Sequence, residues 1–327
     1  MSTRAPLMRG SRPAVLATTL LVDAVLGEPP PALHPVVWMG RGIGCCIPAD
    51  PPRAGRAVLL RGAVVAAGGA ALCGLVGGAA AAGARRLDGR LSVALEAAAL
   101  WPLLALRSLT DAAARVRSAL DAGDLDLARA ELRWLVSRET GGLTAPLLAS
   151  AAVESLAENL GDAVVAPLLA AAVAGPAGAA AHRFVNTADA MVGYPDRFHL
   201  GGRAAARFDD VLGALPAWLS ALAIAAAVPL AGGSGAAALR CLREDGGRTA
   251  SPNSGRPMAA MAGGLGIRLE KRGHHVLNAA GRPPRPEDID RAVRSVRAAT
   301  ALIVAAAAAG LAGARPRRWR RRAPAAL

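Results

Sequence analysis

The uncharged stretch GAVVAAGGAALCGLVGGAAAAGA, residues 62–84, decides the fold class of this chain. A helix needs about 20 mostly apolar residues to cross a bilayer, and this stretch exceeds that length without a single charge. Its Gly and Ala residues allow helices to approach closely in lipid, where packing replaces the hydrophobic drive. We therefore predict a transmembrane helix within the apolar run 57–84.

Other apolar runs on both sides of this stretch are also candidate membrane-spanning helices. The first run resembles a signal peptide because Arg4, Arg9 and Arg12 precede it, but no small-x-small cleavage site follows. We therefore expect a retained first membrane helix, with cleavage as the alternative. The run 91–106 contains Glu96 and could cross the membrane or lie buried. The candidate spans are 13–27, 57–84, 91–106, 163–181, 211–231 and 298–314.

These runs predict an all-α fold, a polytopic helical membrane protein with polar helical and loop segments between the spans. We expect one integral-membrane domain over residues 1–327, in the cell (cytoplasmic) membrane and multi-pass, with a basic C-terminal tail at 315–327. Within the polar segments, 121–131 has a turn followed by a helix start with acidic residues in its first turn. Pro286 to Asp290 has the pattern of another helix start. The basic segment 240–297 and the tail both favour the cytoplasmic side, although the run 298–314 separates them.

The net charge of +14 would suggest a nucleic-acid partner in a soluble protein. Here the arginines lie mainly between and after apolar runs, and no interleaved aromatic residues accompany them. Arginines in these positions orient a membrane protein and meet anionic lipid. We expect the lipid bilayer as a partner and no nucleic acid.

An acidic stripe is the first candidate for chemistry. Glu154, Glu158 and Asp162 follow one another at i, i+4 and i+8, so a helix would place them on one face. Like charges at this spacing repel one another, and no Lys or Arg lies between Glu139 and His182. A cation among them, Mg²⁺ with nucleotide phosphates, would relieve the repulsion. A solvated helix face is the alternative.

Two more polar clusters follow this stripe after an apolar run. Asn186 and Asp189 could ligate one ion or form an Asx turn. Asp209 and Asp210 could hold a metal or cap a helix. Arg207 beside them could bind phosphate with two hydrogen bonds.

Other sequence features limit the chemistry. His34, in a turn after the first apolar run, is expected to be structural. The chain has no GxxxxGK[ST] phosphate loop, no GxSxG and no HExxH motif. ATP chemistry would therefore need a different phosphate cradle, and the segment from Ser251 to Gly255 is a candidate.

Together these segments resemble the cobalamin-biosynthesis adenosylcobinamide-phosphate synthase family, which consists of membrane-bound enzymes that form cobinamide. The motifs run in the family's order over nearly the whole chain, which makes the set highly specific although each motif is weak alone. The matching stretches are Asp23…Gly27-Glu-Pro…His34-Pro…Met39-Gly40, Arg138-Glu-Thr140, Ala152-Val-Glu-Ser…Ala157-Glu-Asn159…Asp162, Val185-Asn-Thr…Asp189…Met191-Val-Gly-Tyr194, Ala206-Arg-Phe-Asp-Asp-Val-Leu212, Ser251-Pro-Asn-Ser-Gly255…Ala260-Met-Ala-Gly263 and Arg282-Pro-Pro…Pro286-Glu-Asp-Ile289.

Two departures from the family pattern stand out. Glu139 stands where the family usually has Asp in an Arg-Asp-Thr motif, which keeps the charge. Gly213-Ala-Leu-Pro216 stands where the family often has Asn-Trp-Ile-Pro, which removes an amide and an aromatic side chain. We therefore assign no role to positions 213 and 214.

The resemblance implies an ATP-dependent ligase of the acid–amine type. It would join a propionate carboxylate of adenosylcobyric acid to (R)-1-amino-2-propanol or its O-phosphate, giving adenosylcobinamide or its phosphate. The implied cofactors are ATP and Mg²⁺, and the implied partners are the corrinoid and aminopropanol or aminopropanol phosphate. A homo-oligomer, or association with other membrane enzymes late in the corrinoid pathway, stays open.

Site roles follow from the resemblance as hypotheses. The expected catalytic residues are Glu154, Glu158, Asp162 and Asp189. The first three are also the expected Mg²⁺ ligands. The expected substrate- or nucleotide-binding residues are Arg138, Asn159, Asn186, Arg207, Asp209, Asp210, Ser251, Asn253 and Gly255.

Three other functions fit parts of the pattern. A multi-spanning transporter or permease would place carboxylates inside the spans, whereas these mostly flank them. A membrane phosphotransferase would show regularly spaced acids on two core helices, which the chain lacks. A non-enzymatic assembly factor would need none of the isolated acids.

Overall fold

A computed structural model describes residues 12–47, 55–193 and 201–313, so the basic tail 315–327 lies outside the described residues. The described chain is almost entirely helical, as the apolar runs predicted, with one short hairpin of strands. Its elements are α2 (Arg12–Leu26), α3 (Pro35–Cys46), α4 (Arg56–Ala84), α5 (Gly89–Leu100), η1 (Trp101–Leu103), α6 (Leu106–Asp121), α7 (Leu125–Leu132), α8 (Ala145–Asn159), η2 (Leu160–Val165), α9 (Ala166–Val192), α11 (Arg203–Ala227), η3 (Val228–Ala231), α12 (Gly235–Asp245), α13 (Gly255–Leu265), β1 (Leu269–Lys271), β2 (His275–Leu277) and α14 (Pro286–Gly313).

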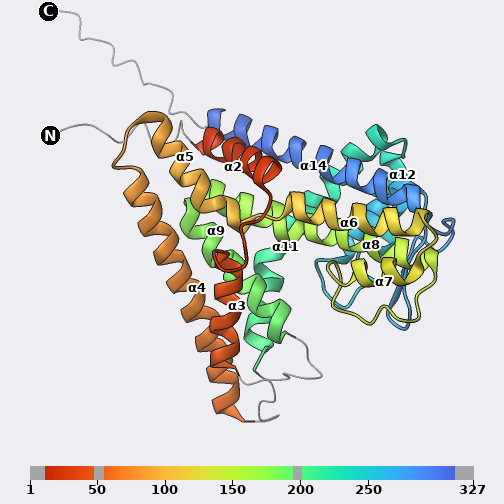
Figure 1. Ribbon diagram of the computed structural model, residues 1–327, viewed down its shortest axis with the longest axis horizontal. Coiled ribbons are helices and arrows are strands. Elements are labelled where there is room, and N and C mark those ends of the chain that lie inside the picture. Colours follow the sequence, from red (N-terminus) through yellow and green to blue (C-terminus); the bar gives the residue numbers. More distant parts are fainter. Residues whose placement is uncertain (1–11, 48–54, 194–200, 314–327) are drawn as a thin grey trace, which may run out of the picture.

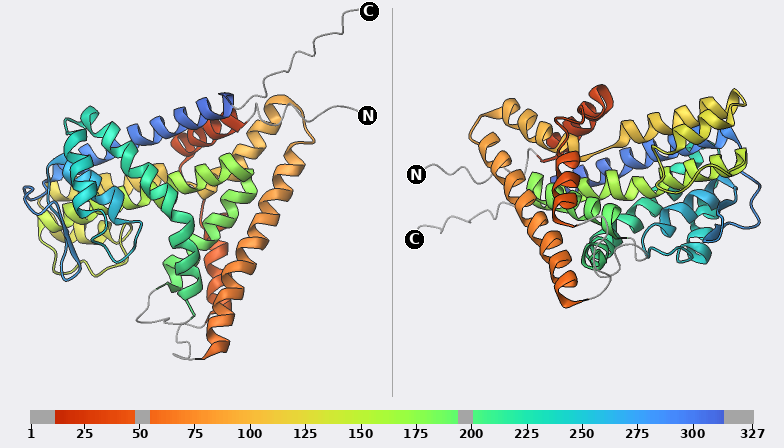
Figure 2. Two further views of the ribbon diagram at one scale, coloured as in Figure 1. Left: turned by 180° about the vertical axis from the view of Figure 1, so that it is seen from behind. Right: turned by 60° about the horizontal axis from the view of Figure 1, so that its bottom comes forward.

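The helices form two groups that meet near the middle of the molecule. The long helix α4 runs obliquely beside α9 and α11, and α3 packs on α9; these helices make the lower part of Figure 1. The helices α6, α8 and α14 lie side by side, with α7, α12 and α13 at their far end (Figures 1 and 2). Because α11 packs against members of both groups, it joins them.

Among the described residues, five helical stretches are long and apolar enough to cross a membrane: Arg56–Ala84, Gly89–Asp121, Ala145–Val192, Arg203–Ala231 and Pro286–Gly310. The surface of α4 supports this, since Leu72 is 62% exposed and Leu75 is 72% exposed. Lipid accommodates such a face, whereas exposed apolar patches of this extent are rare in soluble monomers. Helix α2 has 15 residues, or about 22 Å, so the expected span 13–27 is not among the five.

Glu96, the charge inside the expected span 91–106, has an internal partner. Arg85 at the end of α4 donates from Nε to Glu96 Oε1 at 3.2 Å. Helix α5 packs on α2 and α4, and its carboxylate is largely buried between them. A paired charge is far less costly in an apolar environment than a lone one, which explains how this run tolerates an acid.

Small residues let α4 pack closely on α9. A Cβ atom on Gly77 would lie 2.5 Å from the carbonyl oxygen of Pro176, and one on Gly69 would overlap the Phe184 ring. Glycine at both positions therefore sets the spacing of the two helices, as expected for helix contacts in lipid.

The apolar run 163–181 reverses direction instead of crossing as one straight helix. Gly175 has φ 67° and ψ −157°, a conformation that essentially only glycine adopts, and Pro176 follows it. A Cβ atom on Gly178 would lie 2.6 Å from the carbonyl oxygen of Ala170. Residues eight apart on a straight helix are about 12 Å apart along the axis. Helix α9 is therefore a helical hairpin with its turn at Gly175.

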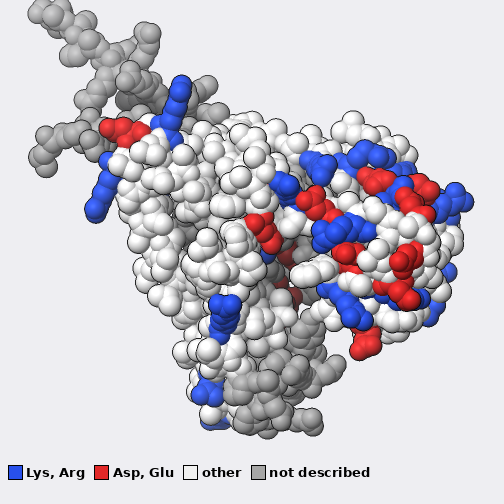
Figure 3. Space-filling view, viewed as in Figure 1, with Lys and Arg blue, Asp and Glu red and all other residues white. Residues whose placement is uncertain are grey.

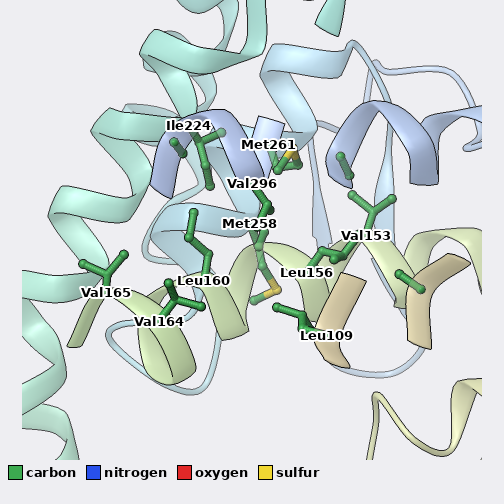
Figure 4. Packing of buried hydrophobic residues seen from close by; sticks show 14 of the residues in the cluster. Leu109, Val153, Leu156, Leu160, Val164, Val165, Ile224, Met258, Met261 and Val296 are labelled. Carbon is green, nitrogen blue, oxygen red and sulfur yellow. The ribbon is translucent and has the colours of Figure 1, made fainter. Parts of the chain in front are cut away.

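The core lies where α8 passes through the group formed by α6, α11, α13 and α14. Every residue of α8 from Leu147 to Ala157 is buried. Leu156, Met261 and Val296 belong to this buried cluster, together with Leu109 and Ile224 (Figure 4). This packing fixes the orientation of α8 and of the carboxylates it carries.

The charged side chains gather at the far end of this second group (Figure 3). The buried Asp288 there accepts hydrogen bonds from Arg282 at 2.7 Å and from Arg291 at 3.0 Å. Helix α14 begins at Pro286, which confirms the predicted helix start. The helix start predicted within 121–131 is confirmed as well, because Asp124 caps α7 by accepting the Leu127 amide hydrogen. Figure 3 also shows acidic atoms recessed in a hollow between the apolar and the charged parts.

Candidate functional site

Glu154 is the buried anchor of the candidate site. Its side chain on α8 is 7% exposed, and Arg138 donates from Nη2 to its Oε2 at 3.0 Å. Ser150, one turn earlier, donates to Oε1 at 3.2 Å. These bonds make Glu154 the partner of Arg138, so the expected Arg-Glu-Thr motif and the acidic stripe meet in the structure.

The stripe continues through a π-helical turn. Helix α8 ends at Asn159 and the chain continues as the π-helix η2, which contains Asp162. A π-turn inserts extra backbone in a helix and re-aims the following side chains, and such turns are frequent at functional sites. Glu158 and Asp162 are half-buried, and both interact electrostatically with Asp209 on α11.

The returning arm of α9 brings the second polar cluster to the first. Arg183 donates from Nη1 to Asn186 Oδ1 at 3.3 Å, and Asn186 donates from Nδ2 to Asp209 Oδ1 at 3.3 Å. A straight helix would separate Asp162 from Asp189 by about 40 Å. In the structure these two carboxylates interact electrostatically, because the hairpin folds the chain back.

The acids therefore form one continuous group from three chain segments. Asp189 interacts with both carboxylates at the start of α11. The ends of α9 and α11 touch, since a Cβ atom on Gly202 would overlap the carbonyl of Val192. Within the described part of the chain, no Lys or Arg forms a salt bridge with Glu158, Asp162, Asp189, Asp209 or Asp210.

The group is nevertheless not a ready-made metal cage. Among the described residues, no three His, Cys, Asp or Glu side chains gather closely enough to hold a metal ion on their own. The carboxylates form a string instead, with Glu154 at one end engaged by Arg138. A string of this kind suits a cation that brings phosphate ligands with it, because Mg²⁺ usually takes one or two carboxylates plus substrate phosphates.

A polar cavity of about 350 Å³ opens beside the string. Glu154, Glu158 and Arg138 line it. The loop from Thr249 to Ser254 and the β1–β2 hairpin provide the other walls. Glu158 thus belongs to the cavity and to the acidic string, so the two are parts of one site.

The hairpin brings positive charge to this cavity. Lys271 and His275 are paired across β1 and β2, and both line the cavity. Burial, followed by the charges of Lys271 and Arg138, lowers the pKa of His275 to about 4, so the imidazole is neutral near pH 7. Sequence reasoning missed these residues, because a single Lys and a pair of His carry no periodic signal.

A third cluster reaches the acids from the N-terminal segment. Ser108 donates to Glu28 Oε1 at 2.7 Å, and His34 Nε2 lies 3.6 Å from Glu28 Oε2. The bond with His34 is the main reason why the pKa of Glu28 lies below its ordinary value. His34 Nδ1 accepts the Val36 amide hydrogen at 3.2 Å and caps α3, which agrees with the expected structural role.

Arg183 connects this cluster to the acids. It interacts electrostatically with Glu28, Asp162 and Asp209, and its Nε is buried without a hydrogen-bond partner among the described residues. Sequence reasoning missed Arg183 because it follows an apolar run and matches no motif. It is an internal counter-charge of the string, since its charge interacts with carboxylates from the N-terminal segment, η2 and α11.

Several expected binding residues have structural partners. Asn159 donates to the carbonyl and hydroxyl oxygens of Ser155 on its own helix. Asn253 donates to the backbone carbonyl of Asp210 at 2.8 Å and ties its loop to α11. Ser251 accepts backbone hydrogens at the start of the next helix.

The remaining two expected binding residues differ in environment. A Cβ atom on Gly255 would lie 2.6 Å from the carbonyl of Gly246, so this glycine is required for packing. Arg207 is exposed and does not line the cavity. Of the expected binding residues, Arg138 and Ser251 line the cavity, while Asn186, Asp209 and Asp210 belong to the acidic group.

The fold and the site define a polytopic helical membrane protein with one acidic, partly cationic pocket between its apolar and charged parts. A family model described as CobD/Cbib protein matches residues 16–296. The chain belongs to this family.

Three relatives illustrate the similarity. The "Cobalamin biosynthesis protein CobD" of Dehalococcoides mccartyi is 38% identical over 275 residues, covering 84% of this chain and 89% of the relative. The protein of the same name from Geobacter metallireducens is 41% identical over 262 residues, covering 78% and 80%. The "Probable cobalamin biosynthesis protein CobD" of Methanothermobacter thermautotrophicus is 35% identical over 276 residues, covering 82% and 87%. No solved structure matches the chain significantly.

Proposed function

We propose that this protein is an ATP-dependent acid–amine ligase of cobalamin biosynthesis in the cell membrane. It joins a propionate carboxylate of adenosylcobyric acid to (R)-1-amino-2-propanol or its O-phosphate. Family membership and the relatives' names support the pathway, and they give no support to a transporter or a lipid phosphotransferase. The product is adenosylcobinamide or its phosphate.

The observation that carries the chemistry is the convergence of carboxylates from α8–η2, α9 and α11 beside a cavity lined by Arg138 and Lys271. Joining an acid to an amine requires an activated carboxylate, because an oxide ion is a poor leaving group. A site whose acids have no salt-bridge partner among the described residues, next to basic side chains, can hold a cation–nucleotide pair and the anionic groups that react with it.

The reaction balances in two steps. A carboxylate oxygen of the corrinoid attacks the terminal phosphorus of ATP, the bond to the bridging oxygen breaks, and ADP leaves with the electron pair. The amine nitrogen then attacks the carbonyl carbon, the bond to the phosphate oxygen breaks, and inorganic phosphate leaves. The nitrogen gives up one proton to a carboxylate or to water.

The donor set fits Mg²⁺ bound together with nucleotide phosphates. Glu158 and Asp162 offer hard oxygen ligands without a salt-bridge partner among the described residues, and Asp209 lies within their electrostatic reach. The metal would offset the charge that develops on the phosphates. Glu154 has a different task here, because its bond with Arg138 orients the guanidinium toward phosphate oxygens.

The other acids position the amine. Asn186 holds Asp209 through a hydrogen bond, and Asp189 and Asp210 complete a negatively charged wall. A protonated amine is attracted to this wall before it loses its proton. Arg183 behind the wall keeps the carboxylates in place while their charge changes.

The test is product formation by the purified protein in lipid nanodiscs. Adenosylcobyric acid, Mg–ATP and either aminopropanol or its phosphate are supplied, and the corrinoids are resolved by mass. We expect amide product, ADP and phosphate in equal amounts, with losses of about a hundredfold or more for Glu158→Gln and Asp189→Asn. Glu244→Gln, at an exposed acid on α12, is the matched control. Full activity of both site variants would refute the proposal.

A further inference from the structure

The β1–β2 hairpin presents two different faces to two cavities. Lys271, the only lysine among 38 basic residues, stands opposite His275 in the strand register, so the two side chains share one face. That face lines the cavity beside Glu154 and Glu158. The next residue, Arg272, lines a separate cavity of about 290 Å³ on the other side. The hairpin therefore aims one cation specifically into the site.

Polar groups on this wall lack partners within the described part of the chain. No carboxylate there lies within salt-bridge distance of Lys271. The His275 side chain is 8% exposed, and its Nε2 has no hydrogen-bond partner and lies 3.8 Å from Glu154 Oε1. The Nε of Arg138 is buried without a partner as well. Buried polar groups in native proteins are almost always satisfied, so the two buried nitrogens of His275 and Arg138, beside a lysine with no salt-bridge partner among the described residues, point to a ligand.

The chemistry and size of the cavity indicate that its ligand is a small molecule with an anionic group. An ammonium and a guanidinium together recognise phosphate oxygens, the guanidinium through paired hydrogen bonds. Ser251, Ser254 and Thr249 add hydroxyl groups to the lining of the same cavity. A volume near 350 Å³ is at the small end of ligand sites, too small to enclose a corrin ring.

We propose that Lys271, His275 and Arg138 form a binding site for the phosphate group of a phosphate ester. The proposal rests on the proposed function for its two carriers, the O-phosphate of aminopropanol and the phosphate chain of ATP. Both offer the same dianionic phosphoryl oxygens. Lys271 supplies positive charge and His275 supplies a neutral ring nitrogen. Glu154 holds the Arg138 guanidinium in place through their hydrogen bond.

Equilibrium binding to the protein in nanodiscs tests this directly. Aminopropanol O-phosphate, free aminopropanol and ATP are titrated by calorimetry into the wild type, Lys271→Gln, Lys271→Arg and Arg272→Gln. For Lys271→Gln we expect affinity for a phosphate ester to fall about tenfold or more, the loss of one charge-assisted hydrogen bond. Lys271→Arg should recover most of it. Arg272→Gln, adjacent in sequence but facing the other cavity, should bind like the wild type.

The titrations with aminopropanol O-phosphate and with ATP show which of these two phosphate esters the site binds. A loss confined to aminopropanol O-phosphate assigns the site to the amine substrate, and a loss confined to ATP assigns it to the nucleotide. Free aminopropanol has no phosphate and should bind equally to all variants. Equal affinities of Lys271→Gln and Arg272→Gln for both esters would overturn the proposal, as would an equal loss in both variants.

The binding readout separates this proposal from the proposed function. A wild-type protein that binds the ester but forms no corrinoid amide would refute the ligase activity and leave the phosphate site standing. A protein that forms the amide while Lys271→Gln binds both esters normally would refute the phosphate site alone. Thermal midpoints of all variants, which we expect to agree, show that each variant is folded.

Discussion

The turn at Gly175 is the point where the fold and the site depend on one residue, and Gly175→Ala tests that dependence. A Cβ atom at this position would meet only Arg85 Nη2 at 3.8 Å, an ordinary contact. The cost of the substitution therefore comes from the backbone, because φ 67° and ψ −157° are essentially restricted to glycine. Strain of this kind amounts to about 1–3 kcal/mol.

That energy would lower the ratio of turned to unturned hairpin by about 5- to 150-fold. An unturned α9 would carry Asn186 and Asp189 away from Asp209, so activity should fall together with stability. Gly68→Ala on α4 is the control, because its Cβ atom would meet nothing within 4 Å and its backbone is helical. Alanine there should stabilise the helix by up to about 1 kcal/mol.

The assay compares thermal midpoints in nanodiscs, followed by tryptophan fluorescence, with the yield of corrinoid amide. We expect Gly175→Ala to lose on both measures and Gly68→Ala to lose on neither. A Gly175→Ala protein that matches the wild type in midpoint and yield would show that the chain does not need this backbone conformation. The explanation for how the acids meet would then be wrong.

Three further predictions concern stability. Arg138→Met should destabilise the protein by about 3–5 kcal/mol because it leaves the Glu154 carboxylate buried without its partner, and adding Glu154→Gln should recover most of this loss in denaturant titrations. Because the pKa of Glu28 lies below 4.5, its carboxylate contributes stability that is complete above the unfolded value and is lost as the pH falls through the folded value. The midpoint difference between wild type and Glu28→Gln should therefore stay constant from pH 7 to about 5 and shrink below about 4.5. Gly77→Leu should cost about 1–3 kcal/mol by forcing α4 away from the Pro176 carbonyl, seen as a lower midpoint.

Length and charge pattern were enough to predict most of the helices. The run 57–84 is uncharged from Gly62 to Ala84, and α4 occupies it as expected. The run 163–181 contains Pro176, but a proline alone indicates a kink, and only the backbone at Gly175 shows a reversal. The helix in the first run, α2, has 15 residues in the described part of the chain, fewer than the roughly 20 that a crossing helix needs. The prediction of one domain over 1–327 stays a prediction.

The sequence predicted the site residues whose local environment is unusual, and it missed those whose local environment is ordinary. Glu158 and Asp162 stood out because unpaired acids beside an apolar run are costly. Arg183, Lys271 and Glu28 did not stand out, since a lone charge in a polar motif or at a helix end is ordinary. Their importance comes from contacts between residues far apart in the sequence, which no local pattern contains.

The hairpin of α9 also resolves a condition that the proposed chemistry imposes. ATP and aminopropanol are water-soluble, so the acids on both sides of the run 163–181 must face one compartment. A straight crossing helix would place Asp162 and Asp189 on opposite sides of the bilayer. A run that turns back at Gly175 contributes no net crossing, so both of its ends emerge together and contact Asp209. The same reversal that requires glycine at position 175 therefore makes a single pocket compatible with a membrane-embedded chain.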